Sequence, residues 1–119
     1  MRPDRLYLAD MLDAAEGIGR FLEGVSREDF LADELRRQAV LMNFVVLGEG
    51  AARVSPTLKA AHPELAWGDI VAFRNFAVHV YFAVKWTIVW DTATFDVPAL
   101  REQLRRVLAD EGLDRGRLS

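Results

Sequence analysis

Apolar residues recur at every third or fourth position through most of this chain, and this spacing constrains the fold more than any other feature. Between Pro3 and Leu22 the apolar residues gather on one side of a single long helix. A second long helix is predicted from Asp33 to Val54. The strict alternation typical of strands is almost absent, so the sequence predicts an all-α fold.

Local signals mark where the helices begin and end. Ser26 stands three residues before Asp29, the arrangement of an N-terminal cap with an acidic first turn. Ser55-Pro56 ends the second long helix and starts a short one, because proline is well tolerated at the first helical position. His62-Pro63 then predicts a turn.

The second half of the chain also reads as helix. We expect helix from about Trp67, a break near Tyr81, and helix again through "VKWTIVWDTATF". Asp96 is predicted to cap a last helix that carries Pro98 in its first turn. The elements together predict an up-and-down bundle of four or five helices.

The length and composition favour one domain that associates with a second copy. The 119 residues are expected to form one domain over 1–119, with residues 111–119 a polar, frayed tail. The chain is 51% hydrophobic, and surplus apolar surface on a small domain often becomes a subunit interface. We therefore expect a homodimer.

Composition excludes several classes of site. The chain has no cysteine and only two histidines, His62 and His79, so no cofactor or metal is expected. Charges in "MRPDRLYLAD" argue against a signal peptide, and Arg74, His79 and Lys85 interrupt the best apolar run, so a cytoplasmic protein without a membrane segment is expected. The net charge of −3 argues against avid, sequence-independent binding of nucleic acid but allows a local site.

Two glycine-containing segments are better explained by packing than by nucleotide binding. "GIGRFLEG" has Leu22 where a dinucleotide loop needs its third glycine, and no strand precedes it, so its first two glycines predict a close helix contact. Gly48 and Gly50 likewise predict a close helix crossing with Glu49 at its edge. A functional role for Glu49 remains an alternative.

Other notable side chains have ordinary structural explanations. His62 in its turn is expected to be solvated or to cap a helix. Trp86 and Trp90 are four residues apart and share a helix face, which favours core packing over base stacking.

The segment "RNFAVHVYF", from Arg74 to Phe82, separates polar from apolar residues. At about 100° per residue on a helix, Arg74, Asn75 and His79 fall within an arc of roughly 140°. Asn75 and His79, four residues apart, can hydrogen-bond. The opposite side carries the apolar residues Phe73, Phe76, Ala77 and Val80.

This polar strip suits phosphodiester chemistry without a metal. An imidazole transfers protons near neutral pH and a guanidinium neutralises a phosphate, which gives His79 and Arg74 complementary roles. Polar contacts across a dimer would explain the same spacing. Tyr81 points near the Arg74 direction if the helix persists, although a core tyrosine is the plain alternative.

Arg74, Asn75, His79 and Tyr81 also reproduce the R-N-x-x-x-H-x-Y motif of the HEPN superfamily, and the chain resembles its HepT-like branch of bacterial and archaeal toxin ribonucleases. The resemblance runs through "GEGAARVSPTLKAAHPELAWGDIVAFRNFAVHVYF" and "KWTIVWDTATFDVPALREQL" and covers most of the chain. It implies a HEPN-type bundle that dimerises with both motifs facing one cleft.

The resemblance further implies a metal-independent endoribonuclease in which Arg74 and His79 are catalytic and Asn75 binds substrate or orients the histidine. It implies the toxin of a HEPN/MNT toxin–antitoxin pair, whose nucleotidyltransferase partner transfers AMP to Tyr81. Val80 replaces an acidic residue that often lies between the motif histidine and tyrosine. A non-catalytic nucleotide-binding or protein-interaction helical dimer is the alternative function.

Overall fold

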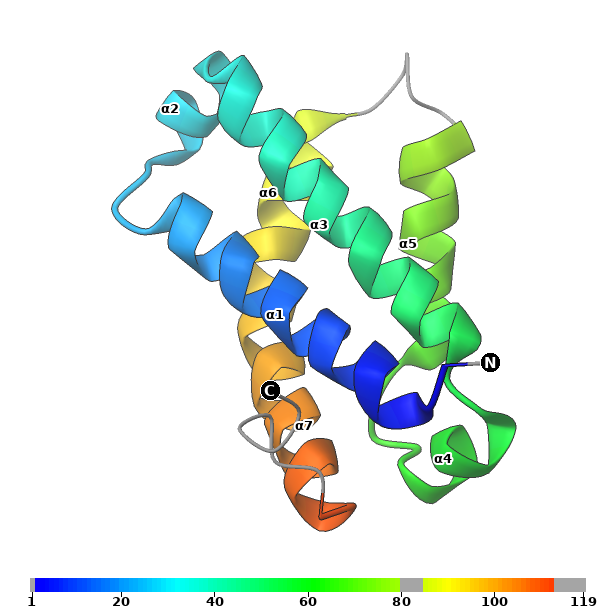
Figure 1. Cartoon of the computed structure of the whole chain (residues 1–119). Coiled ribbons are helices and arrows are strands. Elements are labelled where there is room, and N and C mark those ends of the chain that lie inside the picture. The colour runs from blue at the N-terminus through cyan, green and yellow to red at the C-terminus, as the bar shows by residue number, and fades with distance from the viewer. Residues whose placement is uncertain (1, 80–84, 113–119) are drawn as a thin grey trace.

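The computed structural model describes residues 2–79 and 85–112, with backbone only for residues 77–79 (Figure 1). Every regular element within these ranges is helical, which confirms the all-α fold. The elements are α1 (Asp4–Leu22), α2 (Arg27–Ala32), α3 (Glu34–Arg53), α4 (Pro56–Ala61), α5 (Trp67–His79), α6 (Trp86–Asp91), the π-helical η2 (Thr92–Asp96) and α7 (Val97–Asp110).

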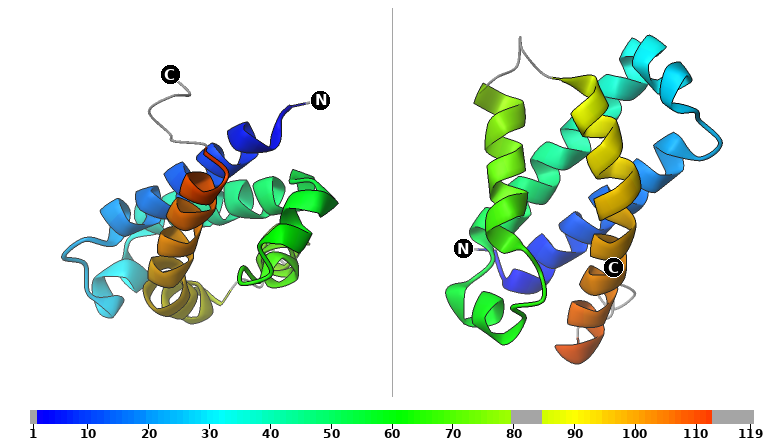
Figure 2. Two further views of the ribbon diagram at one scale, coloured as in Figure 1. Left: turned by 90° about the horizontal axis from the view of Figure 1, so that it is seen from below. Right: turned by 180° about the vertical axis from the view of Figure 1, so that it is seen from behind.

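The long helices form two layers, as the front view (Figure 1) and the view from behind (Figure 2) both show. Helices α1 and α3 run antiparallel in one layer, and α5 lies in the other beside the rod made by α6, η2 and α7. Helix α3 packs on both α1 and α5, while α1 also packs on α7. This arrangement confirms the predicted up-and-down bundle.

Two helix caps read from the sequence are present. The Ser26 hydroxyl accepts the Asp29 N–H at 3.1 Å, and the Ser55 hydroxyl accepts the Leu58 N–H at 3.2 Å. Each bond satisfies a backbone donor that has no partner within its own helix. The Asp4 carboxylate accepts the Ser55 N–H at 2.9 Å, which ties the start of α1 to the start of α4.

Asp96 lies at the N-cap position of α7 with Pro98 in the first turn, as predicted, but it makes no capping bond through its side chain. Its backbone has helical angles, φ −93° and ψ −37°. The chain instead continues from α6 to α7 through η2, where the Val97 N–H donates to the Thr92 carbonyl five residues earlier. Pro98 is tolerated in the first turn of α7, because its missing N–H is a donor that a helix start leaves without a partner in any case.

The core lies between the two layers. Trp86 and Trp90 pack against buried Phe30, with ring centroids 6.5 and 5.4 Å from the Phe30 centroid, which confirms core packing for both tryptophans. The largest fully buried side chains are Phe30, Leu8, Met11, Ile18, Leu47, Leu104, Val40, Val89 and Val107. No helix within residues 2–79 and 85–112 combines the length and apolar character that a membrane crossing requires.

Small residues set the contact between α1 and α3, as the glycine segments predicted. A Cβ on Gly17 would lie 2.7 Å from the Asn43 side chain, and one on Gly50 would lie 3.0 Å from the Met11 sulfur. Neither position has room for a methyl group without movement of its neighbour. The glycines therefore allow the two helices to approach closely.

Of the two predictions for His62, the solvated side chain is wrong, because the residue is buried at 6% exposure, whereas His62 does lie at the C-cap position of α4. Its Nδ1 lies 3.2 Å from a Glu64 oxygen, and its Nε2 lies 3.1 Å from a Glu111 oxygen. The hydrogen bond to Glu111 raises the pKa of His62 most, with Glu64 adding to the rise and burial opposing it. Glu111, predicted to begin the frayed tail, thus bonds to the body of the bundle, while residues 113–119 lie outside the described part.

Candidate active site

Helix α5 crosses α3 where the side chain of Arg74 begins. A Cβ built on buried Gly48 would overlap the Cβ and Cγ of Arg74. The crossing at this distance therefore requires glycine at position 48. The predicted close helix crossing at the "GEG" segment is confirmed, and it brings Arg74 against α3.

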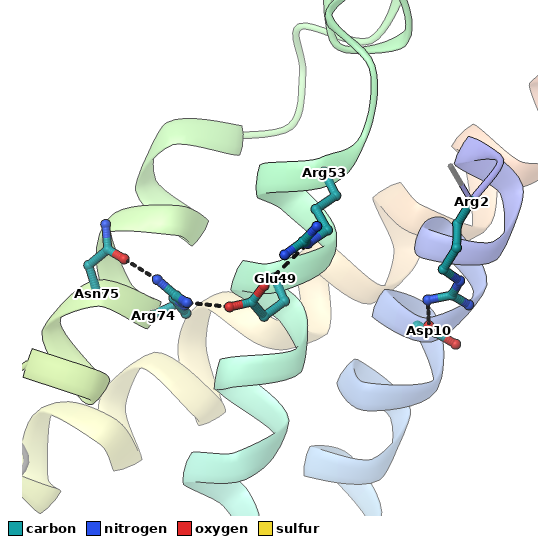
Figure 3. Close-up of polar contacts among 6 residues, drawn as sticks. All are labelled: Arg2, Asp10, Glu49, Arg53, Arg74 and Asn75. Carbon is teal, nitrogen blue, oxygen red and sulfur yellow. Dashed lines mark hydrogen bonds and ion pairs between the residues drawn. The ribbon is translucent and has the colours of Figure 1, made fainter.

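The guanidinium of Arg74 is held from two directions (Figure 3). Its Nη2 donates to Oε1 of Glu49 on α3, and its Nη1 donates to Oδ1 of Asn75 at 2.7 Å. Its Nε is buried and has no hydrogen-bond partner among the described residues. The side chain remains 29% exposed, so solvent or a ligand still reaches the group.

A second arginine shares the same carboxylate. Arg53 lies four residues after Glu49 on α3, and its Nε is 3.5 Å from Oε2 of Glu49 (Figure 3). Glu49 thus lies between two guanidinium groups, and the three side chains carry one net positive charge. The Arg53 side chain is 62% exposed and extends this charge along the surface of α3.

The remaining sequence-predicted site residues are less fully defined. Asn75 is exposed, and its Oδ1 accepts from Arg74, whereas the sequence suggested His79 as its partner. His79 is the last residue of α5, about 7.5 Å along the helix axis from Arg74, and its side chain lies outside the described part. Tyr81, the predicted break beside it and Val80 also lie outside the described residues.

The angular positions of Arg74, Asn75 and His79 around an ideal helix did not show that Arg74 lies against α3. Phe73 does face the bundle as expected, with its ring centroid 4.6 Å from that of Phe44. The neighbouring Arg74 reaches α3 as well, because Gly48 leaves space for its stem. Glu49, for which the sequence left a functional role open, therefore belongs to the site.

Two of the hollows on the described surface border α3 and contrast in their lining. One of about 430 Å³ between α3, α5 and α7 is lined mainly by apolar residues with three carboxylates, Glu64, Asp69 and Asp96, and includes no arginine or lysine. Another of about 330 Å³ between α1 and α3 is lined by Arg2 and Arg53 together with the carboxylates Asp10 and Glu49. Of these two hollows, the second is the one that presents guanidinium groups to a phosphate.

Within the described residues, no group of three or more histidine, aspartate or glutamate side chains is arranged to hold a metal ion. The polar groups around Arg74 are its anchored guanidinium, the Asn75 amide, the Glu49 carboxylate and a second arginine, Arg53. The guanidinium groups among them bind and neutralise phosphate oxygens with a planar pair of donors.

Comparisons with known proteins agree on one family. Residues 11–107 match the family model described as "Ribonuclease HepT-like". A relative from Thermococcus cleftensis named "Probable ribonuclease HepT" is 32% identical over 108 residues, covering 88% of this chain and 98% of the relative. One from Caldanaerobacter subterraneus subsp. tengcongensis named "Putative RNase" is 28% identical over 111 residues, covering 93% of this chain and 99% of the relative. No solved structure gives a significant match.

Proposed function

Because the chain belongs to the ribonuclease HepT-like family of HEPN-type proteins, we propose that it is a metal-independent endoribonuclease whose chemistry is carried by Arg74 and His79. The observation that supports this most is the anchored guanidinium of Arg74. The Arg74 side chain starts at the α3–α5 crossing and remains partly exposed, and Arg74 lies on the same helix as His79.

In this proposal His79 transfers protons and Arg74 stabilises charge. The imidazole removes the proton of a ribose 2′-hydroxyl or protonates the departing 5′-oxygen. The 2′-oxygen attacks the adjacent phosphorus, and the bond from phosphorus to the 5′-oxygen breaks. Arg74 binds the phosphate oxygens as negative charge develops on them. The products carry 2′,3′-cyclic phosphate and 5′-hydroxyl ends, and Asn75 keeps Arg74 or His79 in orientation.

The proposal includes a second copy and a regulatory partner. Two chains would place their motifs around one cleft, so that a substrate meets both copies of Arg74 and His79. The protein would act in the cytoplasm as the toxin of a toxin–antitoxin pair, with a nucleotidyltransferase of the MNT type as its antitoxin. Transfer of AMP from ATP to the Tyr81 hydroxyl, with release of pyrophosphate, would add a phosphate group near Arg74 that competes with RNA for that cation.

The test is cleavage of cellular RNA in EDTA by the purified protein and by Arg74→Ala and His79→Ala variants. Arg105→Ala is a matched control, because this arginine forms exposed ion pairs on α7 with Glu16 and Glu102. We expect the parent and the control to cleave and both site variants to lose activity. Equal cleavage by all four proteins, or none by the parent, would contradict the proposal.

A non-catalytic nucleotide-binding module is the competing outcome of the same experiment. Calorimetry with ATP and AMP measures nucleotide binding directly. Nucleotide binding by a parent protein that leaves RNA intact would support the module and overturn the ribonuclease.

A further inference from the structure

A carboxylate bonded to a phosphate-binding arginine raises a question, because the two anions compete for the same donors. Glu49 occupies this place beside Arg74. We propose that Glu49 is a positioning residue, which holds the guanidinium of Arg74 in the orientation that a phosphate requires. This inference rests on the proposed ribonuclease function and extends the site from α5 to α3.

Packing against α3 holds the aliphatic stem of the Arg74 side chain. Its Cβ lies against Gly48, so the first part of the side chain has little room to change conformation. Its buried Nε shows that the stem passes through packed surroundings. The freedom that remains is mainly at the guanidinium, where Glu49 and Asn75 make their bonds.

The two bonds leave donors available for a substrate. A guanidinium has five N–H groups, and Arg74 gives one from Nη1 to Asn75 and one from Nη2 to Glu49. With Nε buried, each terminal nitrogen keeps one further N–H. A pair of N–H groups on adjacent nitrogens is the arrangement that binds two phosphate oxygens. Glu49 thus orients the guanidinium without using all its donors.

Arg53 offsets the negative charge that Glu49 places beside Arg74. A lone Glu49–Arg74 pair would be neutral and would attract a phosphate weakly. Because Arg53 binds the other carboxylate oxygen, the group of three keeps one positive charge. Arg53 therefore compensates the carboxylate that positions Arg74, and its exposed end adds attraction for the RNA backbone.

Glu49→Leu and Glu49→Gln separate the bonding of Glu49 from its charge. Leucine removes both acceptor oxygens, whereas glutamine keeps one acceptor oxygen for Arg74 but loses the charge and the second acceptor, which faces Arg53. With an oligoribonucleotide substrate, we expect Glu49→Leu to lower kcat by about tenfold or more, because small misplacements of catalytic groups have large effects on rate. Glu49→Gln should retain kcat within about threefold and lower KM, since the cluster gains a net positive charge.

Glu102→Gln is the matched control, because Glu102 forms an exposed ion pair with Arg105 three residues along α7. It should leave kcat unchanged. Unchanged or higher kcat in Glu49→Leu would overturn the positioning role and show that Glu49 only competes with RNA. If the parent also needs Arg74 for cleavage, such a result leaves the ribonuclease proposal intact.

A second readout does not depend on cleavage. Nitrogen NMR of the Arg74 guanidinium reports rotation about its Cζ–Nε bond. Hydrogen bonds from Nη1 to Asn75 and from Nη2 to Glu49 slow this rotation. We expect separate Nη signals in the parent and in Glu49→Gln, and averaged signals in Glu49→Leu. Identical spectra for all three proteins would overturn the inference even if the parent cleaves no RNA.

Discussion

Gly48 of α3 and Arg74 of α5 lie so close together that a side chain at position 48 would occupy the space of the arginine stem. Gly48→Ala must therefore move α5 away from α3 or displace Arg74. Overpacking of this kind destabilises proteins by about 1–3 kcal/mol. We expect Gly48→Ala to lose about that much stability in urea unfolding and to lose RNA cleavage with it.

Gly68→Ala is the control for this substitution. Gly68 is also in α5, but a Cβ there meets no atom within 4 Å. Alanine favours helix over glycine, so Gly68→Ala should change stability by less than about 1 kcal/mol, in the stabilising direction. Equal effects of the two substitutions would contradict the account of the crossing.

Arg53→Ala tests whether the second arginine contributes charge to RNA binding. Removing it leaves Glu49 and Arg74 as a neutral pair, so RNA affinity should fall. Each lost phosphate contact reduces the slope of log affinity against log salt concentration by about 0.7 for a single strand. Binding titrations at several salt concentrations measure this slope. Arg105→Ala should keep the parent slope, and the same slope in Arg53→Ala would contradict the assignment.

His62 predicts a pH dependence of stability that is separate from catalysis. Its pKa in the folded protein is raised above the ordinary 6.5, chiefly by the hydrogen bond to Glu111. The charged form is thus favoured by folding, and this contribution is full below pH 6.5 and is lost as pH rises through the folded-state pKa.

Urea unfolding of the parent and Glu111→Gln at several pH values measures this contribution. The stability advantage of the parent over Glu111→Gln should be larger at acidic pH than at alkaline pH. An advantage that grows with rising pH would show that the neutral imidazole is the favoured form.

Tyr81 is the position at which the proposed partner would act. Co-expression with the cognate nucleotidyltransferase should raise the mass of the parent by one or more AMP units and abolish cleavage. Tyr81→Phe cannot accept AMP through a phenol oxygen, so it should remain toxic and resist neutralisation. Intact-mass spectrometry and growth assays provide the measurements. Equal neutralisation of Tyr81→Phe would exclude modification of this residue as the mechanism.

The sequence predicted those parts of the structure that depend on neighbouring residues. Ser26 and Ser55 cap helices because their hydroxyls bond to backbone groups three residues away. Asp96 stands at the predicted N-cap position of α7 but makes no capping bond, because the chain is already helical through η2, and a cap signal does not distinguish a helix start from a helix that continues.

Contacts between residues far apart in the chain were beyond sequence reasoning. The "GEG" segment indicated a crossing, but nothing local showed that its partner was Arg74, 25 residues from Glu49. The burial of His62 likewise depends on Glu111, which lies 49 residues away. Both depend on how whole helices pack, which a helical period does not specify.

In the proposed reaction, Arg74 assists attack of a ribose 2′-hydroxyl on the adjacent phosphate. Single-turnover cleavage in EDTA of one oligoribonucleotide, and of the same molecule with a 2′-deoxy sugar at the mapped cleavage site, tests it most directly. We predict cyclic phosphate ends from the first substrate, no cleavage at the substituted position, and a rate about 100-fold or more lower for Arg74→Ala. Cleavage of the deoxy-substituted position at the parent rate would contradict the account.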